Sequence, residues 1–186
     1  VKKRCLRPIH EPKNTHIIPG MTTLFETRAH GKLLLTGEYF VLDGAVALAM
    51  PLRYGQRLRV VETAETGILK WISLNETGQA WFEAHFHLPA LEINSATDPE
   101  TAATLQSILL ACRKQKPVFL PGNAGLEVTT EIDFPRDWGL GTSSTLIAAL
   151  SRWADVDPYR VLTDTMGGSG YDIACAISPG PVVYSL

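Results

Sequence analysis

Alternating hydrophobic and polar residues through the middle of the chain predict a sheet-rich domain. The alternation runs over 56–63 and again over 125–132, while 68–74 and 81–88 are shorter apolar segments separated by a polar turn at 75–79. Successive side chains of a strand point to opposite faces, so segments of this kind bury one face of a sheet. We therefore expect mainly antiparallel strands in the middle of the molecule.

Further strands are expected near both ends of the chain. The pattern over 24–39 is strand-like, and its apolar run 33–35 is expected to be buried. Residues 45–50 are also apolar, and this segment is expected to end at Pro51, because proline has no N–H to donate to a neighbouring strand. A last strand is expected over 182–186.

Three segments have helical spacing. Apolar residues recur every three or four positions over 98–114 and over 142–154, and 158–165 is expected to be a shorter helix. Thr97 or Asp98 stands where a side chain accepts hydrogen bonds from the first N–H groups of a helix. The helices are therefore expected in the second half of the chain, after most of the strands.

The two ends of the chain differ from its middle. Residues 1–20 carry basic residues, prolines and histidines without a period, which predicts an unstructured extension before a folded domain over 21–186. The segment 182–186 stops without a following helix or turn. We therefore expect the natural sequence to continue beyond it.

A glycine-rich segment at 135–145 has the clearest chemistry in the sequence. It follows a predicted strand and opens a predicted helix, and Gly139 and Gly141 allow the backbone to turn tightly against a ligand. The first turn of a helix has unpaired N–H groups at the positive end of the helix dipole, which favours an anion. Three hydroxyl groups there can donate to phosphate or bind Mg²⁺: Thr142, Ser143 and Ser144.

A purely structural turn is the competing interpretation of the same segment. Its hydroxyl groups are also good helix caps, and no lysine follows the second glycine as it does in the Walker loop of other nucleotide-binding proteins. The segment is not a dinucleotide fingerprint either. The residues alone leave phosphate binding and simple capping both open.

The loop is one of three motifs, which lie at 31–39, 135–144 and 168–174. Pro135-x-x-x-Gly139-Leu140-Gly141-Thr142-Ser143-Ser144 resembles the ATP loop of the GHMP kinases, the family of galactokinase, homoserine kinase, mevalonate kinase and phosphomevalonate kinase. The first motif resembles the family's N-terminal Gly-Lys and Gly-Glu strand. The third, with the string Gly-Tyr-Asp-Ile-Ala, resembles the segment with the catalytic aspartate in the mevalonate kinase branch, and in particular the GYDIA subgroup.

The resemblance covers about 24–186 and implies an α+β fold. In the family this is an N-terminal domain of the ribosomal protein S5 domain 2-like kind, with a mixed sheet covered by helices. A C-terminal ferredoxin-like domain is expected in the full protein and is missing from this chain. The sequence departs from the family where Thr142 replaces serine, Thr145 replaces alanine and Tyr39 replaces histidine.

The same resemblance implies the roles of individual residues. Asp172 would be the catalytic base and Lys32 its electrostatic partner, although a turn carboxylate and a solvated lysine are the alternatives. The nucleotide would lie against the ATP loop, formed by Pro135, Gly139, Leu140, Gly141, Thr142, Ser143 and Ser144.

The acceptor and the metal ion have their own implied residues. Ser169, Gly170 and Glu38 would contact the acceptor, with a structural salt bridge as the alternative for Glu38. Mg²⁺ would be held by Ser144 and a carboxylate. The glutamate that mevalonate kinases place upstream of the catalytic aspartate has no counterpart, which leaves Asp164 as the nearest acid.

The implied function is ATP-dependent phosphorylation of a small metabolite at a hydroxyl or a phosphate, with mevalonate or phosphomevalonate as the leading candidates. A sugar or homoserine kinase of the same family is one alternative. A nucleotide-binding domain without catalysis is another, and the short chain gives it weight.

Composition limits the partners of this chain. The formal net charge is −2 and no lysine or arginine block follows the first few residues, which argues against nucleic acid. No apolar run approaches the ~20 residues that cross a membrane. The three widely spaced cysteines fit a reducing cytoplasm. His85 and His87 are expected on an exposed strand face rather than at a metal site, and the sequence gives no sign of the oligomeric state.

Overall fold

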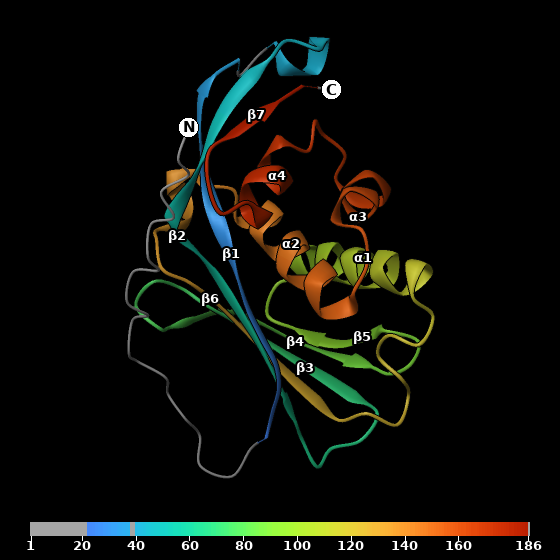
Figure 1. The fold of residues 1–186 in the computed structure, drawn as a ribbon. Helices are drawn as coiled ribbons and strands as arrows, with labels where there is room; N and C mark the ends of the chain where they lie inside the picture. Colours follow the sequence, from blue (N-terminus) through green and yellow to red (C-terminus); the bar gives the residue numbers. More distant parts are fainter. Residues whose placement is uncertain (1–21, 38–39, 186) are drawn as a thin grey trace.

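The computed structural model describes residues 22–37 and 40–185, with the arrangement shown in Figure 1. The strands are β1 (Thr23–Thr36), β2 (Ala47–Glu62), β3 (Ile68–Leu74), β4 (Ala80–His87), β5 (Glu92–Ala96), β6 (Leu126–Ile132) and β7 (Val182–Tyr184). The helices are α1 (Pro99–Gln115), α2 (Thr142–Ala154), α3 (Pro158–Thr165) and α4 (Tyr171–Ile177), with short 3-10 turns η1 (Val41–Asp43) and η2 (Arg136–Trp138). The expected extension at 1–20 lies outside the described residues.

The strands form one mixed sheet in the order β1-β2-β6-β3-β4-β5, and β7 pairs with one end of β2. All of these pairs are antiparallel except β3 with β6, which is parallel. The connection between these two strands passes through β4, β5 and α1. The helices gather on one side of the sheet, so the α+β class expected from the sequence is confirmed (Figure 1).

The interior lies between the sheet and these helices. Strands β3 and β4 turn alternate side chains inward, as the sequence pattern predicts, while α1 and α2 supply aliphatic residues from above. Asp98 caps α1 by accepting hydrogen bonds from the N–H groups of Glu100 and Thr101, which confirms one of the two expected caps. The largest fully buried side chains include Trp71, Phe82, Phe86, Leu58, Leu69, Ile108, Leu109, Ile147 and Leu150.

Pro51 does not end a strand as expected, because β2 continues through it from residue 47 to residue 62. On one side β2 pairs with β7 only at 47–49 and with β6 only at 56–62. Pro51 lies in the gap between these partners, where its missing N–H leaves no ladder bond unmade on that side. On the other side it lies opposite Lys32, next to a register shift between β1 and β2.

The sequence pattern missed two elements. Strand β5 has mostly exposed side chains, so it has no alternation of polar and apolar residues to detect. Helix α4 has only seven residues, too few to show a helical period in the sequence. Short elements of this kind are held by their neighbours rather than by their own pattern.

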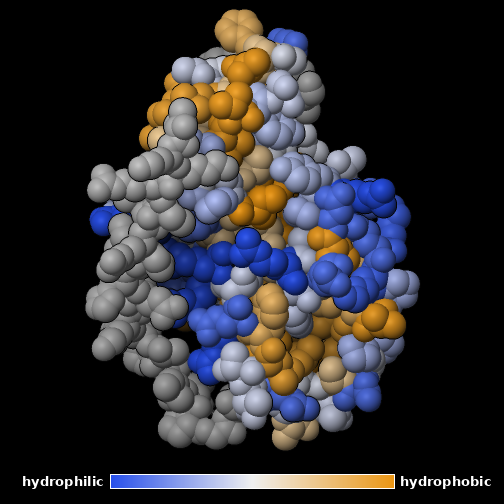
Figure 2. Space-filling view, viewed as in Figure 1, coloured by the Kyte–Doolittle hydropathy of each residue, from blue (hydrophilic) through white to orange (hydrophobic). Residues whose placement is uncertain are grey.

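The run 33–35 was expected to be buried, and this is wrong for the described residues: Leu33 and Leu35 are both 48% exposed. They belong to the end of the molecule where β1, β2 and β7 meet, together with the exposed Phe40, Val46 and Val183. Figure 2 shows hydrophobic surface gathered at this upper end. The sheet therefore presents apolar side chains to solvent there.

Candidate active site

The glycine-rich loop leads directly into α2. Turn η2 ends at Gly139 and α2 begins after Gly141, and both glycines have left-handed backbone angles, with φ of +67° and +87°. No side chain caps this end of α2, and of the first three helical residues Ser143 is exposed. The expected anion site is therefore a helix N-terminus whose first N–H groups are not occupied by a side-chain cap.

Lys32 on β1 is held against this loop through its backbone. Its N–H donates to the carbonyl of Leu140 at 2.9 Å, because the register shift beside Pro51 turns this part of β1 away from regular pairing. A Cβ atom on Gly141 would lie 3.2 Å from Cγ of Lys32. The stem of the lysine therefore passes directly beside the start of α2.

The ammonium group of Lys32 lies between two side chains of α4. Nζ is 3.5 Å from Oδ1 of Asp172, forms an ion pair with it, and donates a hydrogen bond to the Tyr171 hydroxyl at 3.2 Å. Burial alone would lower the pKa of Lys32, but the charge of Asp172 and the hydrogen bond to Tyr171 leave that pKa raised. Lys32 is therefore held as a cation next to the candidate base.

Asp172 is only partly engaged in this arrangement. Its Oδ1 atom is buried, lies 3.5 Å from Nζ of Lys32 and makes no hydrogen bond to any of the described residues. A buried carboxylate oxygen without a hydrogen bond is costly, and the nearby charge of Lys32 offsets part of that cost. The side chain as a whole is 32% exposed, so an acceptor hydroxyl can approach the carboxylate from its exposed side.

The turn that carries Asp172 is clamped by two tyrosines. Gly170 has φ of +85°, and a Cβ atom there would lie 3.1 Å from ring atom Cδ1 of Tyr159 and 3.1 Å from the hydroxyl oxygen of Tyr184. The Tyr184 hydroxyl also donates to the carbonyl of Ser169. Ser169 and Gly170 therefore shape the approach to α4, and their contact with an acceptor stays a prediction.

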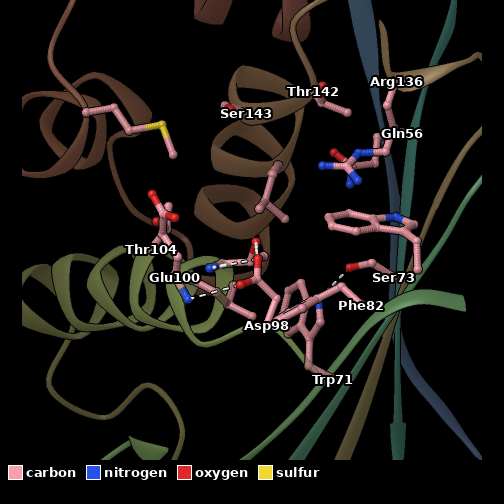
Figure 3. A pocket seen from close by; sticks show the side chains of 15 residues that line it. Gln56, Trp71, Ser73, Phe82, Asp98, Glu100, Thr104, Arg136, Thr142 and Ser143 are labelled. Carbon is pink, nitrogen blue, oxygen red and sulfur yellow. Dashed lines mark hydrogen bonds between the residues drawn. The ribbon is translucent and has the colours of Figure 1, made fainter. Parts of the chain in front are cut away.

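A cavity of about 310 Å³ opens on another side of the α2 N-terminus. Thr142 and Ser143 line it from the loop, while its other walls come from β2, β3, β4 and α1 (Figure 3). The guanidinium of Arg136 stacks over the ring of Trp81, 3.5 Å from its centroid. Polar side chains of the sheet lie in the same wall, among them Gln56 and Ser73.

A buried hydrogen bond ties α2 to this wall. The Thr145 hydroxyl donates to Oε1 of Gln56 at 2.8 Å, and both side chains are buried. The threonine that stands in place of the commoner alanine thus has a partner across the interface between α2 and β2. The side chain of Gln56 therefore contacts both α2 and the cavity.

Other predicted residues have different surroundings. Asp164 forms an ion pair with Lys114 at 2.8 Å, which occupies its carboxylate. This ion pair argues against Asp164 as a Mg²⁺ ligand, and that role stays a prediction. Within 22–37 and 40–185, no group of three acidic, histidine or cysteine side chains could hold a metal ion. Glu38 lies outside the described residues. Pro135 precedes η2 as expected.

The sequence did not single out every residue that the structure brings to the site. Tyr171 stood inside the third motif without a role of its own, although a tyrosine next to a candidate base is a visible signal. The cavity residues Gln56, Trp81 and Arg136 come from separate segments. Arg136 lies inside the 135–144 motif and Gln56 is a polar residue in a predicted strand, but neither received a role from the sequence.

Three of the solved structures that share this fold are kinases by name. Mevalonate kinase from Leishmania major, solved with R-mevalonate, matches 90% of this chain and 50% of its own length, with 18% identity and a TM-score of 0.58. Heptose 1-phosphate kinase from Bacteroides thetaiotaomicron matches 87% of this chain and 59% of its own length (16% identity, TM-score 0.58). Galactokinase from Lactococcus lactis, solved with galactose, matches 83% and 39% (14% identity, TM-score 0.55).

These likenesses show the fold, and the chain spans between 39% and 59% of these three structures. They confirm the expected α+β fold of the kind found in GHMP kinases. No family model and no curated protein matches the sequence. Among the described residues, no helix has the length and apolar character needed to cross a membrane.

Proposed function

We propose that this chain is the ATP-binding part of a small-molecule kinase of the GHMP type. One observation carries the proposal: the N-terminus of α2 lies beside a lysine whose ammonium is 3.5 Å from a partly exposed carboxylate. A phosphate bound at the N-terminus of α2 would lie next to both the Lys32 cation and the Asp172 carboxylate. Phosphoryl transfer requires this positioning and charge more than it requires covalent catalysis.

In this proposal the nucleoside occupies the cavity lined by Trp81, Arg136 and Gln56. The triphosphate follows the wall to Thr142 and Ser143, which belong both to the cavity and to the helix N-terminus. The N–H groups of that turn bind its oxygens, and the last phosphate lies toward Lys32. Gly141 has no Cβ, so the stem of Lys32 can pack against the start of α2.

The acceptor enters on the Asp172 side. The exposed side of the Asp172 carboxylate takes the proton of the acceptor hydroxyl, or orients that hydroxyl, for in-line attack on the γ-phosphorus. Lys32 stabilises the negative charge that develops on the transferred group. If the acceptor is a phosphate group, it needs no base, and Asp172 then only orients it.

Mg²⁺ would neutralise charge on the triphosphate when it is bound. The hydroxyl of Ser144 in the first turn of α2 is a suitable ligand, but the described side chains do not complete a metal site around it. Asp164 is engaged by Lys114, and no acidic cluster is present in the described part of the chain. The residue roles above therefore do not depend on the ion.

Mevalonate or phosphomevalonate is the proposed substrate class, because the third motif resembles that branch. A sugar substrate is the second candidate, and two sugar kinases with this fold favour it. We also propose that the protein acts in the cytoplasm. Turnover with a panel of mevalonate, phosphomevalonate, galactose and homoserine separates the substrate classes.

The decisive test compares Asp172→Asn with wild type. The variant should bind ATP–Mg²⁺ with unchanged affinity in a calorimetric titration, because Asp172 faces the acceptor. Its turnover should fall by at least about 100-fold, the usual contribution of a catalytic base.

Asp155→Asn is the matched control. Asp155 ends α2 with a left-handed backbone that asparagine tolerates, and its carboxylate pairs with Lys116 at the surface. Equal turnover of the two variants would contradict the proposal. Nucleotide binding without turnover in wild type would favour a nucleotide-binding domain without catalysis.

A further inference from the structure

The distance between Lys32 and Asp172 is longer than in the other lysine–carboxylate pairs of the described residues. Three other lysine–carboxylate pairs close to 2.8 Å between nitrogen and oxygen: Lys70–Glu127, Lys114–Asp164 and Lys116–Asp155. The Lys32–Asp172 pair stays at 3.5 Å although it is more buried on the lysine side than any of these. Burial strengthens the attraction between opposite charges, so something must hold the ammonium back.

Tyr171 is the group that holds it. Its hydroxyl accepts a hydrogen bond from Nζ of Lys32 at 3.2 Å, and the ammonium lies 5.4 Å from the centroid of its ring. Burial raises the pKa of Tyr171, so the phenol stays protonated and accepts with a lone pair. The backbone N–H of Lys32 is already fixed to Leu140, which leaves only the lysine side chain to move.

We propose that the hydroxyl of Tyr171 is a positioning group that keeps Lys32 from closing onto Asp172. The consequence is visible at Oδ1 of Asp172, which is buried and has no hydrogen bond within the described residues. A lysine in full contact would donate to this oxygen and lower the basicity of the whole carboxylate. Tyr171 therefore keeps the carboxylate basic toward an acceptor hydroxyl that approaches its exposed side, while Lys32 remains charged beside it.

This inference rests on the proposed kinase function, and Tyr171→Phe tests it. Phenylalanine keeps the ring under the ammonium and removes only the hydroxyl. A crystal structure of the variant should show Nζ and Oδ1 closing from 3.5 Å to the 2.8 Å of the other pairs. Turnover should fall about tenfold, a part of what a general base contributes, while the KM for ATP stays unchanged.

Two controls separate positioning from loss of structure. Tyr159→Phe removes a hydroxyl from a tyrosine whose ring packs on the same turn at Gly170, and it should leave turnover unchanged. In a Lys32→Ala background, Tyr171→Phe should cause no further loss, because Tyr171 acts through the lysine. A merely structural role would give an equal loss in both backgrounds.

An unchanged Nζ–Oδ1 separation in Tyr171→Phe overturns the inference, whether or not turnover is measurable. A closed pair with wild-type turnover also overturns it. If wild type shows no turnover but Nζ and Oδ1 move together in the variant, the positioning role of Tyr171 is supported and only the proposed kinase function is contradicted. The structural and kinetic readouts thus test the two proposals separately.

Discussion

At the scale of single residues, the site depends on how closely the backbone of the loop approaches Lys32. Gly141 has φ of +87°, and a Cβ atom on it would lie 3.2 Å from Cγ of Lys32. Gly139 has a similar φ of +67°, but a Cβ atom there would meet nothing within 4 Å. Substitutions at these two glycines can therefore be compared to separate the cost of backbone strain from the cost of crowding Lys32.

Gly141→Ala should therefore be worse than Gly139→Ala. Each substitution places a side chain in the left-handed region, at a cost of about 1–2 kcal/mol in the free energy of unfolding. Gly141→Ala should lose about 1 kcal/mol more, because the new methyl group displaces the stem of Lys32. Urea unfolding of both variants measures the difference, and equal losses would show that the lysine moves aside freely.

The structure brings together residues that the motifs selected. Lys32, Asp172 and the loop 139–144 were all selected from the sequence, and the lysine lies beside both the loop and the carboxylate. The 3.2 Å contact between Lys32 and Tyr171 was not predicted, because the resemblance implied a role for Asp172 and none for Tyr171. No local pattern reports a contact of that kind.

At the scale of elements, α1 and the sheet form the largest part of the interior. Cys112 on α1 is fully buried, and burial raises its pKa from 9.0 to about 12. The folded protein therefore keeps this thiol protonated at a pH where the unfolded chain releases the proton. The contribution of the protonated Cys112 thiol to the free energy of unfolding is fully present below pH 9.0 and decreases as the pH rises toward about 12.

Cys112→Ala should make unfolding less sensitive to alkaline pH. Above pH 9.0 the wild-type free energy of unfolding should fall more steeply than that of the variant, by about 1.4 kcal/mol for each pH unit. Cys175 and Lys32 titrate in both proteins and cancel in the comparison. Urea unfolding at several pH values up to about 10.5 measures the slopes, and parallel curves would contradict the expectation.

The elements that the sequence predicted best are those with a long, one-sided pattern. The segments 142–154 and 158–165 match α2 and α3 residue for residue. β5 was missed because both of its faces are polar, and the break expected at Pro51 was wrong because a gap between two partner strands tolerates proline. In both cases the neighbours decided the outcome.

At the scale of the whole molecule, the proposed nucleotide touches elements from the entire chain. The cavity takes residues from β2, β3, β4, α1, η2 and α2, and Lys32 adds β1. A ligand that binds only the folded arrangement of these elements stabilises all of them together. Nucleotide binding is therefore measurable as a change in global stability, even without turnover.

ATP–Mg²⁺ should raise the thermal midpoint of the chain. At 100 times its Kd, a ligand adds about 2.7 kcal/mol, which corresponds to roughly 5–10 °C for a domain of this size. Asp172→Asn should show the same shift, since its carboxylate faces the acceptor. Differential scanning calorimetry with and without nucleotide measures the effect, and an unchanged midpoint at millimolar ATP would contradict nucleotide binding by this chain.

The sequence by itself determined the parts that local physics fixes: the strands and helices with a clear period, the helix start after two glycines, and the residues of three motifs. Only the tertiary structure decided that this helix start has no side-chain cap, that β1 carries Lys32 to the α2 loop, that Tyr171 shares its ammonium with Asp172, and that six elements enclose one cavity. The reason is physical. Periodicity and turn chemistry act over a few residues, whereas a site is made where distant segments are brought together by the burial of a common core.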